Sequence, residues 1–124
     1  MAIVHSHDPE IGMTHVACTG PLRAAELARH WEEIYSDPVV LDAGRVFVDL
    51  RACDIAFTGA ELLELAGRDW PQGQTANLRM AVLVATPEQF DAARQFQLLA
   101  RSDAQHHVFF NEDEAIDWLL SDRE

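Results

Sequence analysis

The chain has 124 residues, 48% of them hydrophobic, and its 21 aspartates and glutamates outnumber its 9 lysines and arginines, giving a net charge of −12. This length and composition predict one globular domain, residues 1–124, that can bury a core without a disulfide or a metal. The negative charge repels phosphate backbones and anionic lipids, so we expect neither nucleic acid nor a membrane surface as a partner. Membrane insertion is not expected either, because the longest apolar run, Met80 to Ala85, is too short to span a bilayer.

The cysteines and the start of the chain indicate a cytoplasmic protein. Cys18 and Cys53 lie far apart and match no spacing typical of a metal site or a disulfide framework, so we expect reduced, half-buried thiols. Residues 1–8 contain no basic region and no long apolar segment, so a signal peptide is not expected.

The first part of the chain predicts a β-hairpin. Ile3 to Ser6 is a short segment with an apolar start, and residues 8–12 have the composition of a turn. Met13 to Thr19 shows the alternation that is typical of a strand. We expect the two strands to pair antiparallel at one edge of a sheet.

A first helix is predicted from Gly20-Pro21, because proline at a first-turn position already has helical φ. Apolar residues then recur at helical spacing as far as Tyr35. The helix is expected to end near Asp37-Pro38, since a residue before proline is pushed out of the helical region. Residues 39–43 are expected to link it to the next strand.

The strand from Arg45 to Leu50 is the centre of the predicted fold. Its apolar run indicates burial on both faces, and Arg51 to Asp54 is expected to be a loop. Thr58 to Glu61 has the form of a capping box, which predicts a second helix that ends between Gly67 and Pro71. A polar loop over residues 72–77 is expected to follow.

The second half of the chain continues the alternation of strands and helices. Residues 78–85 predict another buried strand, and Thr86 to Gln89 predicts a third capped helix. His107 to Phe110 predicts a last strand, and Asn111 the cap of a final helix. The fold class is therefore α/β, with a mixed, mostly parallel sheet of about five strands flanked by four helices.

Several segments, in this order, resemble the SpoIIAA-like family of the STAS fold, the fold of sulfate-transporter and anti-anti-sigma-factor domains. They are Val48 to Arg51, Thr58 with Glu61-Leu62, Arg79 to Val84, Ala93 to Phe96, and Val108 to Leu119. The last segment is the most specific, because an aromatic strand end is followed by an acidic cap and Ala-x-x-Trp-Leu. The resemblance covers most of the chain and implies the fold, since the family consists mostly of small bacterial proteins of unassigned function.

The resemblance also implies a role for Thr58. In anti-anti-sigma factors, a serine at the start of the helix after the central strand is phosphorylated, which switches partner binding. Thr58 occupies that place here, so the resemblance implies it as the phospho-acceptor. The family motif resembles Asp-Ser-Ser-Gly, however, and Phe57-Thr58-Gly59-Ala60 lacks the aspartate. The simpler interpretation is that Thr58 only caps the helix.

A phosphate or nucleotide site is disfavoured. Ligands of open α/β sheets bind beyond the C-terminal ends of the strands, where three helix N-termini are expected to converge and favour an anion. Acidic residues already occupy these first turns, namely Glu61, Glu88, Glu112, Asp113 and Glu114. The sequence also contains no Gly-rich phosphate loop, and we expect no cofactor.

Histidines near the N-terminus are candidate metal ligands. His5 and His7 lie on one face of a strand, and three ligands meet if the hairpin register brings His15 beside them. A solvated edge strand explains the same pattern without a metal, and we adopt that interpretation. A catalytic pair of Cys53 with a histidine has no support from spacing.

The third predicted helix has a wide apolar surface, because Phe90 and Phe96 lie apart around it. This surface can line a pocket for a lipid-like molecule, form a dimer interface, or pack under the edge of the sheet.

We therefore expect a non-enzymatic regulatory or protein-interaction module of the STAS type. Its partner is an unidentified protein, and a homodimer is one option. The interaction surface is expected to be residues 51–63. The alternative is a carrier or sensor of a small apolar ligand bound between the third helix and the sheet. A third hypothesis is an enzyme that uses His5, His7 and His15, or Cys53.

Overall fold

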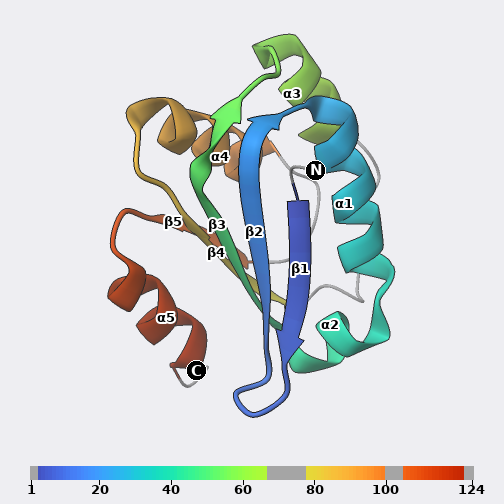
Figure 1. Ribbon diagram of the computed structural model, residues 1–124, viewed down its shortest axis with the longest axis vertical. Helices are drawn as coiled ribbons and strands as arrows, with labels where there is room; N and C mark the ends of the chain where they lie inside the picture. The colour runs from blue at the N-terminus through green and yellow to red at the C-terminus, as the bar shows by residue number, and fades with distance from the viewer. Residues whose placement is uncertain (1–2, 67–77, 100–104, 122–124) are drawn as a thin grey trace.

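The computed structural model describes residues 3–66, 78–99 and 105–121. Its elements are β1 (Ile3–Asp8), β2 (Met13–Leu22), α1 (Ala24–Ser36), α2 (Pro38–Ala43), β3 (Arg45–Ile55), α3 (Gly59–Ala66), β4 (Arg79–Leu83), α4 (Pro87–Leu99), β5 (Gln105–Phe109) and α5 (Glu112–Leu120). The strands form one sheet in the order β1-β2-β3-β4-β5, which is also their order in the chain (Figure 1).

The sheet is mixed and mostly parallel, as predicted. β1 pairs antiparallel with β2, while the pairs from β2 to β5 are parallel. β3 lies at the centre, which explains its long apolar run. The predicted end of the second helix, between Gly67 and Pro71, and the predicted loop over residues 72–77 lie outside the described residues.

The order of the strands decides where the helices lie. Parallel strands are joined by right-handed crossovers, and crossovers that all step in the same direction place their helices on the same face of the sheet. The core follows this rule, because α1, α2, α3 and α4 all contribute to one cluster with the sheet. The helix α5 follows the last strand, is not a crossover, and packs on the opposite face (Figure 1).

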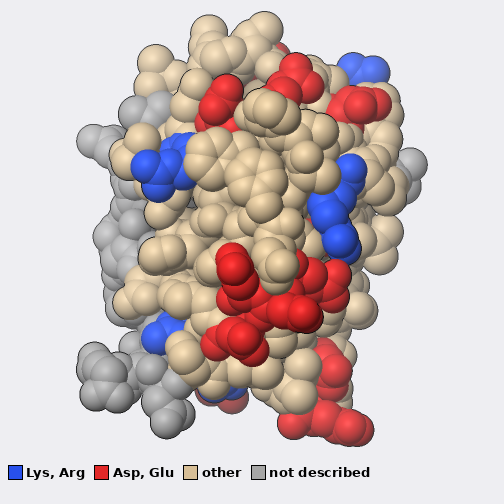
Figure 2. Space-filling model, turned by 90° about the vertical axis from the view of Figure 1, so that its left-hand side faces the viewer, with Lys and Arg blue, Asp and Glu red and all other residues tan. Residues whose placement is uncertain are grey.

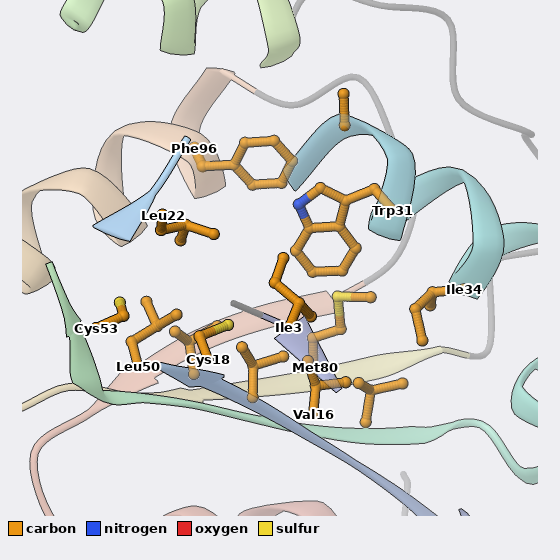
Figure 3. Packing of buried hydrophobic residues seen from close by; sticks show 14 of the residues in the cluster. Ile3, Val16, Cys18, Leu22, Trp31, Ile34, Leu50, Cys53, Met80 and Phe96 are labelled. Carbon is orange, nitrogen blue, oxygen red and sulfur yellow. The ribbon is translucent and has the colours of Figure 1, made fainter. Parts of the chain in front are cut away.

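The first core lies between the sheet and the helices α1 to α4. Trp31 of α1 stacks on Phe96 of α4, with ring centroids 5.6 Å apart and planes 6° from parallel (Figure 3). Alternate residues of the central strands point into this core, among them Val48 of β3 and Met80 of β4. These apolar contacts between elements from both halves of the chain form the larger part of the described interior.

The second core lies under α5 and is smaller. Its fully or almost fully buried members are Met13, Phe47, Ala81, Leu83, Ala115 and Leu119. Phe47 and Val48 are adjacent in β3 but lie in different cores, as the alternation of a strand requires. The sheet is therefore buried on both faces where α5 covers it.

Two arginines at the starts of neighbouring strands hold the C-terminal end of α5. Arg45 Nε donates to the Leu119 carbonyl over 2.9 Å. Arg79 Nη1 donates to the Trp118 carbonyl over 2.7 Å and lies 2.9 Å from Ser121 Oγ, and its guanidinium lies 5.1 Å from the Trp118 ring centroid. Guanidinium groups at a helix C-terminus satisfy free carbonyls and favour the negative end of the helix dipole.

The prediction of a loop after Leu50 and of a helix start at Gly20-Pro21 is wrong. The strand β3 continues to Ile55 because β2 continues beside it, with Gly20 paired to Cys53 and Leu22 to Ile55 after a register shift. Gly20 adopts φ 69°, a left-handed conformation that glycine takes without strain. Pro21 is tolerated because β1 pairs with β2 only as far as Cys18.

The predicted link over residues 39–43 is also wrong, because it forms the short helix α2. The Asp37 carboxylate accepts a hydrogen bond from the Val39 amide over 3.0 Å and caps the helix. Pro38 occupies its first turn, and Gly44 ends it at φ 77°. The structure thus describes five helices where the sequence predicted four.

Arg79 offers a direct test of how α5 is held. Arg79→Lys keeps the charge but loses the planar fork of donors, so we expect unfolding to need about 2 kcal/mol less free energy. The matched control is Arg94→Lys on the exposed surface of α4, where we expect a change within about 0.5 kcal/mol. Urea denaturation measures both, and equal effects of the two substitutions would show that the Arg79 contacts do not stabilise the fold.

Candidate functional site

The candidate site is the edge of the sheet where β3, β4 and β5 end and where α3, α4 and α5 begin. We call it the C-terminal edge. Its architecture follows from the parallel strands, since each strand reaches the same edge before the chain turns into a helix. The starts of α4 and α5 lie at the ends of β4 and β5, but β3 continues from Leu50 to Ile55 beyond its last pair with β4, so α3 begins farther along and the predicted convergence holds only for α4 and α5.

Capping residues form each of these helix starts as predicted. At α3, Thr58 Oγ1 accepts from the Glu61 amide over 3.1 Å, and Glu61 Oε1 accepts from the Thr58 amide over 2.9 Å. Thr86 and Gln89 form the same reciprocal pair at α4. At α5, Asn111 Oδ1 accepts from the Glu114 amide over 3.0 Å. These bonds satisfy amides that a helix leaves free, so the loops are held in one conformation.

Gln89 also joins α4 to the central strand, a role that the sequence analysis missed. Its side chain is 3% exposed, and its Nε2 donates to the Cys53 carbonyl of β3 over 2.9 Å. Its Oε1 accepts from the Ala85 amide over 2.8 Å. One buried amide thus fixes the start of α4 against the end of β3. The capping pattern marked Gln89, but only tertiary structure shows the second contact.

An aromatic pair lies at the C-terminal edge, formed by the exposed Phe110 and the half-buried Phe90. Phe110 directly follows β5, is 57% exposed and stacks on Phe90 in the first turn of α4, with ring centroids 5.3 Å apart. Phe57, in the loop before α3, is half-buried, and Leu63 of α3 is exposed. The sequence analysis placed Phe110 in the last strand and did not recognise it as a surface residue.

The charges around the aromatic pair are mostly acidic. The first turns carry Glu61, Glu88, Glu112, Asp113 and Glu114. Figure 2 shows, on the side of α5, a group of acidic side chains beside a surface without charged groups. An edge with this distribution repels a phosphate and attracts a basic partner.

Arg51 is a cation within this acidic region. Its guanidinium donates to both carboxylate oxygens of Asp49, over 3.0 and 2.9 Å, and to Glu112 over 3.2 Å. These hydrogen bonds lower the pKa of Asp49. Arg51 thus links the central strand to the first turn of α5, although an exposed ion pair of this kind stabilises a fold only slightly.

Phe90 and Phe96, which the sequence analysis considered together, lie in different places. Phe96 is 7% exposed and lines a cavity of about 60 Å³ in the first core, together with Trp31, Val48 and Val108. A cavity must reach roughly 150 Å³ to hold a molecule as small as benzene. Phe90 stacks on Phe110 at the C-terminal edge instead. The geometry of the described residues therefore gives no support to a lipid carrier.

The histidines of the hairpin do not form the trio that a metal would need. The pairing register puts His15 opposite Ser6, and so on the other face of the sheet from His5 and His7. His15 packs edge-on against Phe47, with centroids 5.3 Å apart, and His7 Nδ1 lies 3.2 Å from Thr14 Oγ1. The neighbour of His5 is a residue that sequence reasoning did not consider, His30 of α1, at 5.2 Å between ring centroids.

The two cysteines are free and fully buried rather than half-buried. Burial raises the pKa of Cys18 to about 12 and, with the nearby Asp54, that of Cys53 to about 11. The thiolate is the nucleophilic form, and it is scarcely populated in either residue at neutral pH. The site therefore gives no support to a Cys53 nucleophile.

Comparison with known proteins identifies the fold. The chain matches no known family model, and no curated protein matches it. A solved structure that is similar is an uncharacterized protein of the DUF3478 family with a SpoIIAA-like fold, from Shewanella loihica PV-4. The two chains share 15% identity with a TM-score of 0.52, over 95% of this chain and 92% of the other. The fold of this chain is therefore SpoIIAA-like, which confirms the fold that the sequence resemblance implied.

The structure also bears on the membrane. Among the described residues, no helix is long and apolar enough to cross a bilayer.

The raised thiol pKa values lead to a prediction about reactivity. We expect Cys18 and Cys53 in the native protein to react with a disulfide reagent at mildly alkaline pH at least about 100-fold more slowly than in urea, because both thiolate population and access are reduced. The reagent releases a coloured thiolate as it reacts with each cysteine, and the absorbance of this product measures the reaction rate. If the two cysteines react at different rates, the single substitutions Cys18→Ala and Cys53→Ala show which rate belongs to which residue. A native thiol that reacts within tenfold of the unfolded rate would contradict the described burial.

Proposed function

We propose that this chain is a non-enzymatic protein-interaction module of the STAS type, and that its partner binds the C-terminal edge. The observation that carries the proposal is the stacked pair of the half-buried Phe90 and the exposed Phe110, at the place where α4 and α5 begin. Aromatic side chains are enriched at protein interfaces and often dominate the binding energy there.

The surroundings of the pair indicate the chemistry of the partner. Acidic first turns lie beside Phe110, and the capping bonds and Gln89 hold the loops in place. A partner that fits this edge presents an apolar side chain for the aromatic pair and basic groups around it. Rigid loops reduce the entropy that binding would otherwise lose, so this edge is suited to a specific partner rather than to many.

Thr58 lies at the start of α3, beyond the end of β3, and provides a means of regulation. It is exposed, directly follows the half-buried Phe57, and caps α3 with its hydroxyl oxygen. A phosphate on this oxygen would bring negative charge to the acidic edge next to Glu61. In the proposed function, phosphorylation of Thr58 therefore strengthens the binding of a basic partner.

Substitution of Phe110 tests the interaction surface. We expect Phe110→Asp to lower partner binding at least about tenfold, because it removes the apolar contact and puts a hydrated carboxylate where the partner's apolar side chain would pack. Leu98→Asp is the matched control, since Leu98 of α4 is 71% exposed and lies outside the aromatic pair. Affinity capture with quantitative mass spectrometry compares the two variants with the unchanged chain.

The capture experiment can support or contradict the proposed partner site. Proteins that are captured by the unchanged chain and by Leu98→Asp, but not by Phe110→Asp, support the proposal. If Phe110→Asp captures the same proteins, or if the captured protein is a second copy of this chain bound elsewhere, the C-terminal edge is not the partner site. Circular dichroism of each variant shows that the fold is retained.

Two substitutions of Thr58 distinguish a regulatory role of this residue from its role as a helix cap. Aspartate caps a helix as well as threonine does, so Thr58→Asp should leave the free energy of unfolding within about 0.5 kcal/mol yet raise the capture of a basic partner. Thr58→Ala loses the cap, and we expect it to lower the stability by about 1 kcal/mol while capture remains. Urea denaturation and capture are measured on both variants. Unchanged capture by Thr58→Asp would rule out charge at Thr58 as the switch.

A further inference from the structure

A second group of chemically reactive side chains lies on the opposite side of the first core from the aromatic pair, between β1 and α1. It consists of His5 in the middle of β1 and of His30 and Glu33, which are three residues apart on α1. One ring nitrogen of each histidine and one carboxylate oxygen of Glu33 all lie within 4.8 Å of one another. Residues at this spacing share one side of a helix, and here that side faces the edge strand.

The buried member of this group is His30. Its side chain is 7% exposed, and its Nε2 has no hydrogen-bond partner among the residues that the structure describes. A buried polar nitrogen without a partner costs free energy, and native structures rarely keep one without a reason. Burial also lowers the pKa of His30 to about 4, so its imidazole is neutral at neutral pH, the form that binds metals.

We propose that His5, His30 and Glu33 bind a divalent transition-metal ion, with Zn²⁺ as the reference case. Two imidazoles and one carboxylate are a recognised ligand set for zinc, with a fourth position left for water. Tetrahedral zinc with bonds of about 2.0–2.1 Å holds its ligand atoms about 3.4 Å apart, so the group has to contract slightly. Glu33 is exposed and can make this movement, while His30 supplies the fixed point.

The space beside the group fits an ion and a water molecule. A hollow of about 40 Å³ is lined by Ile3, Glu26, Arg29, His30 and Glu33. A water molecule needs roughly 10–15 Å³ measured in this way. Arg29 brings one positive charge to the hollow, and Glu26 and Glu33 bring two negative charges, so the local balance favours a cation.

Such an ion would join the edge strand to the first helix. In the pairing register, His5 lies opposite Val16 and only two residues from the described start of the chain. A bound ion would stabilise the packing of β1 on α1, two elements that otherwise share few contacts. The gain in the free energy of unfolding would grow with metal concentration. Mg²⁺ and Ca²⁺ prefer oxygen ligands and are not expected to bind.

The test uses the full chain, purified without a histidine tag and stripped with EDTA. Isothermal titration with ZnCl₂ at neutral pH and physiological salt should show one ion per chain. Zn²⁺ at 100 times its Kd should raise Tm by about 5–10 °C, whereas Mg²⁺ should leave it unchanged. We expect Glu33→Gln and His5→Ala each to weaken zinc binding at least about tenfold, because each removes one ligand.

Two matched controls separate this site from general attraction to an acidic chain. Glu32→Gln removes the exposed acid next to Glu33, and His15→Ala removes the exposed histidine on the other face of the hairpin. Both should bind zinc within twofold of the unchanged chain. The proposal is overturned if the unchanged chain binds no zinc, if Glu33→Gln and His5→Ala bind it as well as the controls do, or if His15→Ala abolishes binding.

Discussion

The constraint on which the structure depends is the handedness of the connections between parallel strands. Because the strands lie in the sheet in the order in which they occur in the chain, every right-handed crossover places its helix on the same face. That face is covered by four helices and contains the larger core. Among the described residues, the helix that covers the other face is the final one, which no crossover positions. Arg45 and Arg79 supply the positioning instead, by binding the last carbonyls of that helix.

The same arrangement separates the two proposed activities in space. The strands β4 and β5 end together, so their loops, helix caps and the aromatic pair form one surface at which a partner can bind. The antiparallel strand β1 lies at the far side of the sheet and borders the first helix, where the two imidazoles and the carboxylate meet. Loss of metal binding and loss of partner binding are therefore expected to be independent, since substitutions far apart usually have additive effects.

Much of the fold could be predicted from the sequence, because local rules and the tertiary structure agree. The continuous apolar runs gave the central strands, and Thr58, Thr86 and Asn111 marked three helix starts that the structure confirms. Two predictions, the loop after Leu50 and the helix start at Gly20-Pro21, failed where a partner strand outweighed a local signal. Gly20-Pro21 has the composition of a helix start, but its pairing with the extended end of β3 keeps it in the sheet.

The candidate sites were less accessible to sequence reasoning, because they depend on register and packing. The three histidines of the hairpin were visible, yet a strand reverses the face of a side chain at every residue, and this places His15 away from His5. The real neighbours, His30 and Glu33, lie on a helix whose rotation about its axis no local pattern reveals. The exposure of Phe110 was missed for a similar reason. The strand β5 ends at Phe109, and the next residue, Phe110, already lies on the surface.

The position of α5 also has a consequence during synthesis of the chain. The strands and the four helices on the first face can assemble as they emerge, because each strand pairs with its predecessor. The second face, with Met13, Phe47 and Leu83, stays open to water until residues 112–121 have been made. A ribosome-bound intermediate would therefore display this apolar surface longest, and it is the state of the protein most in need of a chaperone.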